Sequence, residues 1–182
     1  MTTYNVELAT GQVALYERSG LVGWGITLVT GGNKSHAGLI IVDGGRHYVL
    51  DARKPYCDVR PISADVRHGA RIKIARLPYG CEWDAAGLAD FAYQIEGYAP
   101  YATRKMLRNA WTETFGVGSL PDPEGIPSRF MCSELVSCLC RLFASVDPCP
   151  TRPDRYTTPD DLDRKSSLVT VTDRLTLQEA AP

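Results

Sequence analysis

The sequence predicts a mixed α+β fold in which an antiparallel sheet packs against helices. A β-hairpin between residues 37 and 52 is the clearest sign of the sheet, because two β-rich apolar runs flank a glycine-containing turn. Apolar residues at helical spacing in 85–95, and a largely apolar run from Cys132 to Ala144, are the clearest signs of the helices. The chain of 182 residues has a length usual for one domain.

The sheet is predicted to begin with a short apolar strand over residues 11–16. The hairpin follows, with strands 37–42 and 47–52 joined by the turn Asp43-Gly44-Gly45-Arg46. Residues 70–77 alternate apolar and basic side chains, as expected of a strand in a sheet with one wetter face. A last strand is predicted over residues 167–171.

The helical pattern begins at Asp84 and ends before Gly97. The helix from Cys132 to Ala144 is expected to be the central one. Residues 157–162 read as a helical turn with a threonine cap and a proline at its first position.

Three segments carry weaker signals. Residues 21–30 are broken by glycines and are predicted as a short helix or irregular structure. Residues 112–129 are rich in glycine and proline and are predicted as a loop. The polar tail 173–182 is expected to be poorly ordered, which leaves a single domain over 1–182 with a core of about 11–171.

Composition and charge exclude several classes of protein. With 44% hydrophobic residues and 23% charged residues, the chain can bury a core. Its formal net charge of −1 gives no long-range attraction to nucleic acid or to an anionic membrane, and the basic residues of 60–76 are interpreted as a solvated face. No apolar run is long enough to cross a bilayer, and the first residues lack a secretory pattern. We therefore expect a protein that is cytoplasmic when synthesised.

The six cysteines are predicted to be reduced thiols rather than a disulfide framework, because no signal peptide is seen and the core is ample. The spacing Cys132-x5-Cys138-x-Cys140 lacks the paired short spacings of structural zinc sites, and no histidine lies at a matching offset. The sequence therefore predicts neither a metal nor another cofactor.

Cys132 is the candidate nucleophile because it lies at the start of an apolar helix. The first N–H groups of a helix have no helical partner, and the helix dipole places partial positive charge there. Both effects favour a thiolate, which is the nucleophilic form of cysteine. Cys138 and Cys140 lie inside the helix and fit the alternative role of small buried residues.

A thiolate nucleophile needs a base, and His36 is the candidate among the three histidines. It opens the first hairpin strand, and Gly38 removes bulk on the same face of that strand. If Asp43 pairs with Arg46, Asp51 becomes the diagonal neighbour of His36. Asp51 is therefore predicted to orient the ring of His36, the alternative being an ordinary ion pair with Arg53.

The motifs Ser35-His36-Ala37-Gly38, Leu50-Asp51-Ala52 and Met131-Cys132-Ser133-Glu134 resemble the permuted papain-like family. That family includes YiiX-like relatives of NlpC-type cell-wall peptidases and, more distantly, lecithin:retinol acyltransferase-like enzymes. Its members carry the histidine before the cysteine, whereas ordinary papain-like enzymes have the reverse order. Further similar segments are found at 11–15, 26–30, 97–101 and 158–162. Asp51 departs from the glutamate that is more frequent in the family, which shortens the reach to His36.

The resemblance implies a permuted papain-like (NlpC-type) fold with the catalytic cysteine at a helix N-terminus. It implies a cysteine peptidase or amidase with Cys132, His36 and Asp51 as catalytic residues, and Tyr101 and Ser35 in substrate binding. Glu134 is interpreted as structural. The implied substrate is a peptidoglycan peptide or another amide. Because no signal peptide is seen, one expected route is a phage tail or virion component, with phage tail or virion proteins as partners, and the other is a cytoplasmic amidase or muropeptide-recycling enzyme.

Two alternatives stay open at this point. A thioester-forming acyltransferase or lipid deacylase would use the same residues, but it would need an exposed apolar patch to meet lipid. A non-catalytic structural or binding module would keep the fold without the chemistry.

Overall fold

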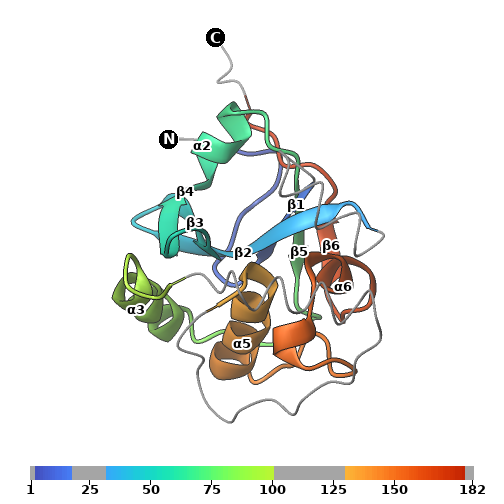
Figure 1. Cartoon of the computed structure of the whole chain (residues 1–182). Helices are drawn as coiled ribbons and strands as arrows, with labels where there is room; N and C mark the ends of the chain where they lie inside the picture. The colour runs from blue at the N-terminus through green and yellow to red at the C-terminus, as the bar shows by residue number, and fades with distance from the viewer. Residues whose placement is uncertain (1–2, 18–31, 101–129, 179–182) are drawn as a thin grey trace.

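The computed structural model describes residues 3–17, 32–100 and 130–178. Six strands form one antiparallel sheet in the order β4-β3-β2-β1-β5-β6 (Figure 1). The strands are β1 (Val13–Glu17), β2 (Lys34–Asp43), β3 (Arg46–Ala52), β4 (Cys57–Pro61), β5 (Ile72–Arg76) and β6 (Val169–Thr172).

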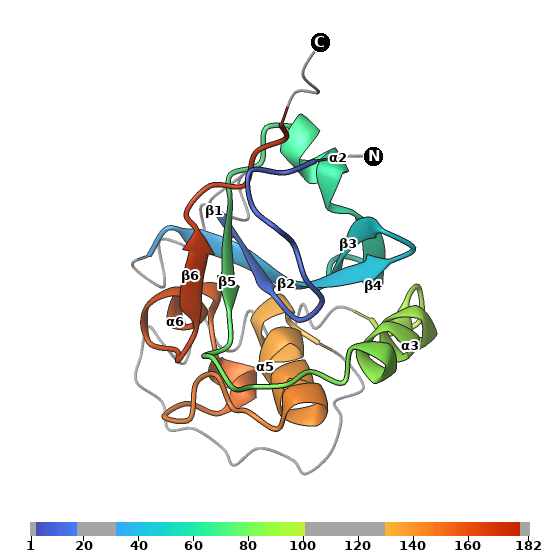
Figure 2. The ribbon, with the colours of Figure 1, turned by 180° about the vertical axis from the view of Figure 1, so that it is seen from behind.

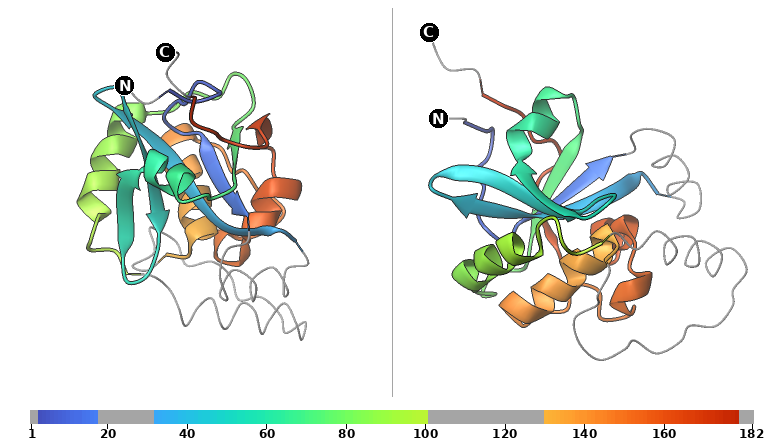
Figure 3. Two further views of the ribbon diagram at one scale, coloured as in Figure 1. Left: turned by 90° about the horizontal axis from the view of Figure 1, so that it is seen from above. Right: turned by 60° about the vertical axis from the view of Figure 1, so that its left-hand side comes forward.

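Helices cover both faces of this sheet. They are α2 (Ile62–Arg67), α3 (Ala85–Ile95), α5 (Cys132–Ala144) and α6 (Pro159–Arg164), with a short 3₁₀ turn at Asp154–Tyr156. Helices α3, α5 and α6 lie on one side of the sheet, and α2 lies on the other (Figure 1). Figure 3 shows α3 and α5 side by side beneath the strands. The fold among the described residues is therefore mixed α+β, as the sequence predicts.

The core has two parts because the central strands are buried on both faces. Leu39 and Ile41 of β2 point to the side of α5 and pack with Leu135 and Leu139. Ile40 points to the opposite side and packs in a second cluster with Val49, Ile62 of α2 and the N-terminal residues Tyr4 and Leu8. A strand covered on both sides reads as a continuous apolar run, and residues 39–42 of β2 are such a run.

Local signals set the helix boundaries. The Asp84 side chain accepts a hydrogen bond from the Gly87 N–H at 2.9 Å at the start of α3. The Thr158 hydroxyl oxygen caps α6 by accepting from the Asp161 N–H, and the Asp161 carboxylate accepts from the Thr158 N–H, which is a capping box. At its C-terminal end, α5 stops at Ser145, whose backbone is left-handed with φ 55°.

The predicted strands and helices are confirmed with shifts of up to three residues at their ends, the largest at the start of β2, and α5 has the predicted bounds. Neither β4 nor α2 was predicted from the sequence. Predictions for 21–30 and for 112–129 fall outside the described residues.

The expectation of a poorly ordered tail is wrong for residues 173–178. Leu175 is 1% exposed, and its N–H donates to the Ile72 carbonyl at 2.8 Å. Leu177 forms an isolated bridge with Tyr4, and Gln178 N–H donates to the Thr3 carbonyl at 2.9 Å. Figure 2 shows β6 and the residues after it running beside β5. The core thus extends beyond 11–171 at both ends, because the two terminal segments pack on each other and on the sheet.

Candidate functional site

Cys132 is the first residue of α5 and is 4% exposed. The residues around it are held by hydrogen bonds within the start of α5 and to one other segment. The Glu134 carboxylate accepts from the Met131 N–H at 3.2 Å, which confirms a structural contact for Glu134. Ser133 donates its hydroxyl to the Thr157 carbonyl at 2.5 Å, which ties the start of α5 to the segment that leads into α6.

His36 is the third residue of β2, and α6 fixes the backbone just before it. One oxygen of the Asp160 carboxylate accepts from the N–H groups of Asn33 and Lys34, at 3.0 and 3.1 Å. Gly32 leaves room for this carboxylate, since a Cβ there would overlap Asp160. The sequence predicts the helical turn over 157–162, but it does not reveal this contact of Asp160.

The predicted hairpin register is confirmed. Asp43 pairs with Arg46 and Gly38 pairs with Asp51, so His36 and Asp51 are diagonal neighbours on one face. The His36 Nε2 and Asp51 Oδ2 atoms are 2.8 Å apart. A Cβ at Gly38 would lie 3.0 Å from the Asp51 Cβ, so the glycine gives the aspartate its place. With that room, the short aspartate side chain reaches His36.

Two arginines hold the other side of Asp51, which is fully buried. Arg60 of β4 places two guanidinium nitrogens against its two carboxylate oxygens, each at 2.9 Å. Arg53 adds an Nε contact to Oδ2 at 3.0 Å. Burial raises the pKa of the Asp51 carboxyl, but the charges of His36 and Arg60 outweigh it and hold that pKa well below the usual range. The alternative of an ion pair between Asp51 and Arg53 is thus present together with the contact to His36.

Cys132 and His36 are within hydrogen-bonding reach of each other, and the Ala37 N–H also donates to the Cys132 sulfur. Because Asp51 occupies His36 Nε2, Nδ1 is the ring nitrogen left for Cys132. Burial raises the pKa of the Cys132 thiol, but His36 and the Ala37 N–H lower it below its ordinary value. Burial lowers the pKa of His36, but Asp51 and Cys132 raise it to about 9. The pair is therefore favoured as thiolate and imidazolium.

Of the two substrate-binding candidates from the sequence, only Ser35 lies among the described residues. Ser35 is buried, and its hydroxyl donates to the Glu17 carbonyl at 3.3 Å, away from the neighbouring His36. Tyr101 lies outside the described residues.

Sequence reasoning missed Arg60 as part of the site. The basic residues of 60–76 were interpreted as a solvated face, and for Arg60 this is wrong, since its side chain is 17% exposed. The alternation in 57–60, with Cys57 and Val59 apolar and Asp58 and Arg60 charged, is that of a short strand. That signal could have placed Arg60 on the same face as Asp51.

The remaining cysteines are free thiols, all but Cys81 buried. Their positions fit packing rather than chemistry. Within the described residues, no group of three or more His, Cys, Asp or Glu side chains lies close enough to hold a metal ion. No helix in the described part of the chain is long and apolar enough to cross a membrane.

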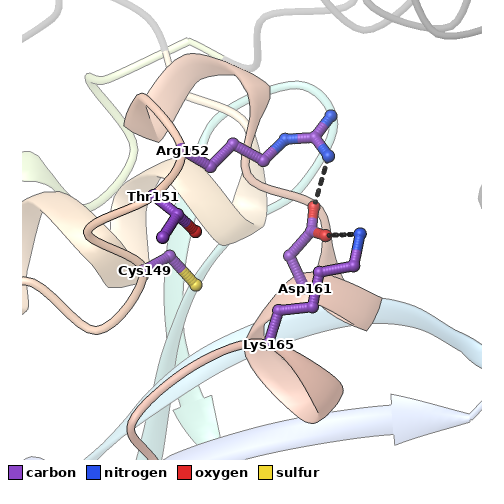
Figure 4. A pocket seen from close by; sticks show the side chains of 5 residues that line it. All are labelled: Cys149, Thr151, Arg152, Asp161 and Lys165. Carbon is purple, nitrogen blue, oxygen red and sulfur yellow. Dashed lines mark ion pairs between the residues drawn. The ribbon is translucent and has the colours of Figure 1, made fainter.

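A separate pocket lies beside α6, with a cavity volume of about 170 Å³. Figure 4 shows the Asp161 carboxylate between two cations, with Arg152 at 3.2 Å and Lys165 at 2.9 Å. Thr151 and Cys149 complete its described lining. Neither Cys132 nor His36 is among these lining residues, so the pocket is distinct from their contact.

Comparison with known proteins gives the fold alone. The chain is similar to the crystal structure of metalloprotein yiiX from Escherichia coli O157:H7, described as DUF1105, with a TM-score of 0.64 and 18% sequence identity. The similarity covers 90% of this chain and 96% of that one. No protein-family model matches the sequence, and no curated protein matches it either. The fold is therefore YiiX-like.

Proposed function

We propose that this chain is a cysteine hydrolase of the permuted papain-like type that cleaves amide bonds. Cys132 is the nucleophile, His36 the base and acid, and Asp51 the residue that orients His36. One observation carries the proposal. Three side chains far apart in sequence form a continuous line of contacts, from the Cys132 thiol to the His36 ring and on to the Asp51 carboxylate.

The first half of the reaction is acylation. The Cys132 thiolate attacks the carbonyl carbon of the amide, a C–S bond forms, and the carbonyl electron pair moves to oxygen. The N–H groups of the first turn of α5 lack helical partners, so they stabilise that oxyanion. The imidazolium of His36 then gives its Nδ1 proton to the leaving nitrogen as the C–N bond breaks, which leaves a thioester on Cys132.

The second half is deacylation. Neutral His36 takes a proton from water, and the hydroxide attacks the thioester carbonyl. The C–S bond breaks, the acid leaves, and the thiolate and imidazolium are restored. Asp51 stabilises the imidazolium at the start and end of the cycle, because its charge is fixed 2.8 Å from Nε2.

The chain order of the three residues supports the permuted type. His36 and Asp51 come from the hairpin β2–β3, and Cys132 comes from a helix 80 residues after the end of β3. The YiiX-like fold agrees with the group to which the sequence motifs bear a resemblance.

The proposed substrate is a peptidoglycan peptide, on the strength of the same resemblance. The exposed large hydrophobic side chains of the described residues give little support to the alternative of a lipid substrate. In the described part of the chain the exposed large hydrophobic residues are four tyrosines, Leu142 and Val169, whereas binding to a lipid surface calls for a contiguous apolar patch.

The test is digestion of purified peptidoglycan followed by mass spectrometry of the released fragments. We expect new amine and carboxylate ends from the wild-type chain and none from Cys132→Ala. Cys138→Ala is the matched control, since Cys138 is on the same helix and equally buried, and it should cleave normally. Full cleavage by Cys132→Ala would overturn the mechanism. Cleavage of phospholipid esters alone would overturn the proposed substrate class but leave Cys132 as the proposed nucleophile. Release of fragments by purified virions would test the expected virion association.

A further inference from the structure

A closed ring of contacts runs through His36 and four other side chains. The edge of Tyr16 lies against the His36 ring, with centroids 5.5 Å apart. The Tyr16 hydroxyl donates to Asp65 Oδ2 at 2.7 Å, and Arg60 reaches the same carboxylate at 2.6 Å. Arg60 in turn binds Asp51, which returns to His36. Four adjacent strands and α2 each contribute one member of this ring.

Strand register explains why the ring forms. Tyr16 pairs with His36 across β1 and β2, and Val49 pairs with Arg60 across β3 and β4. Since side chains alternate along a strand, Tyr16, His36, Asp51 and Arg60 all lie on one face of the sheet. Helix α2 starts directly after β4 and brings Asp65 over that face.

We infer that Arg60 is a positioning residue of the site, which fixes the Asp51 carboxylate in the orientation that serves His36. This inference rests on the proposed function. Arg60 contacts neither Cys132 nor His36 in the described structure, so it acts through Asp51.

The shape of the guanidinium group suits this role. One edge of Arg60 meets both oxygens of Asp51, and the other edge meets both oxygens of Asp65, with Nε 3.3 Å from Oδ1. A planar fork with five donors can bind two carboxylates at fixed angles, and a lysine ammonium cannot. Asp65 thus fixes the orientation of Arg60, and Arg60 fixes the orientation of Asp51.

Charge within the group is close to balanced. Arg53 and Arg60 supply two positive charges against the carboxylates of Asp51 and Asp65. The charged and titratable groups that face Asp51 and Arg60 come from every neighbouring element: Tyr16, His36, Arg53, Cys57, Asp58, Asp65 and Cys132. Removal of Arg60 acts on Cys132 in two ways, because it deletes a nearby cation and frees Asp51 to turn from the imidazolium. Both effects make the thiolate harder to form.

The test measures Cys132 alone and needs no substrate. The full chain is alkylated with neutral iodoacetamide at a series of pH values, and the modified Cys132 peptide is quantified by mass spectrometry. In Arg60→Gln we expect the acid limb of the rate profile to move up by about one pH unit, which is a tenfold lower thiolate fraction below the inflection. Arg60→Lys should shift the limb by less, since it keeps the charge and loses the fork.

A purely structural ion pair would lower the melting temperature without moving this limb. Lys73→Gln is the matched control, because it breaks a half-buried ion pair between β5 and Asp163 of α6, 2.7 Å long and away from the ring. If Arg60→Gln does not fold, Arg60→Lys decides, because it keeps the positive charge and loses only the planar fork, and it should still move the limb upward.

An unchanged limb in the folded Arg60→Gln variant, or in Arg60→Lys where Arg60→Gln does not fold, would overturn the inference and leave the proposed function intact. A wild-type Cys132 that titrates like a free thiol would instead contradict the proposed function, and this inference with it.

Discussion

The first turn and the middle of α5 each carry a cysteine, in two different electrostatic environments. Cys132 in the first turn and Cys138 in the interior are each 4% exposed, so access to solvent does not distinguish them. Their pKa values move in opposite directions. Burial raises the pKa of the Cys138 thiol to about 11, whereas His36 and the Ala37 N–H outweigh burial at Cys132 and lower its pKa. Burial alone therefore makes a thiol inert, and only a fixed cation with a directed N–H makes it reactive.

The largest expected effect is selective alkylation of Cys132. At pH 7 a thiol with a pKa of about 11, as at Cys138, is ionised in about one molecule in 10⁴. The lower nucleophilicity of a more acidic thiolate offsets part of the difference, so we expect Cys132 to react on the order of 100-fold faster than Cys138. Peptide mass spectrometry after brief treatment with iodoacetamide gives both rates in one sample. Equal rates would remove the contrast between the first turn and the middle of the helix.

Asp51→Asn tests the cause of this contrast. The neutral amide no longer stabilises the imidazolium, so the pKa of His36 should fall from about 9 toward its ordinary range. We expect cleavage at pH 8 to drop by at least about tenfold, which corresponds to one pKa unit. Fragment yield measures the loss, and the ¹H–¹⁵N resonances of the His36 ring measure the pKa directly.

The matched control for this variant is Asp43→Asn in the exposed hairpin turn, which should cleave at the wild-type rate. An unchanged His36 pKa in Asp51→Asn would show that Asp51 has no part in the ion pair.

The residues of this contrast were predictable where local pattern sets position. Alternation and the Gly44-Gly45 turn set the hairpin register, and the register alone brought Asp51 beside His36. The start of α5 was predictable because the apolar run begins there. Both signals arise from neighbours along the chain or across one turn.

Arg60, Asp65 and Tyr16 were not predictable in the same way. Their contacts join β1, β4 and α2, and no turn connects β1 to β4. Strand β4 is five residues long and ends in Pro61, so its propensity signal is weak. Asp160 escaped prediction for a similar reason, because its partners Asn33 and Lys34 lie more than 120 residues away.

The pH profiles of two reactions at Cys132 should distinguish the role of its thiolate from the role of the His36 proton. Alkylation needs the thiolate alone, so it should rise through the lowered pKa of Cys132 and stay high at alkaline pH. Amide cleavage also needs the His36 proton for the leaving nitrogen, so it should fall above pH 9, about tenfold for each further pH unit. Fragment yield and alkylation rate measured in the same buffers give the two curves. Parallel curves at alkaline pH would show that His36 does not act as the acid.

The smallest expected effect concerns the interior of α5. Cys140 is fully buried among apolar side chains, and burial raises the pKa of its thiol. Cys140→Ser places a hydroxyl there and should lower the free energy of unfolding by about 1–3 kcal/mol, since a buried polar group without a good partner is costly. Urea unfolding measures this loss. Cys81→Ser is the control, because Cys81 is only partly buried and should change stability little.

The same Cys140→Ser protein should alkylate at Cys132 at the wild-type rate once the folded fraction is taken into account. The two cysteines are eight positions apart on α5, and the contacts that lower the Cys132 pKa come from His36 and Ala37 of β2, not from within the helix. A fall in Cys132 reactivity with unchanged stability would mean that the interior thiol takes part in the chemistry. The reactive role of Cys132 and the packing role of Cys140 would then no longer be separate.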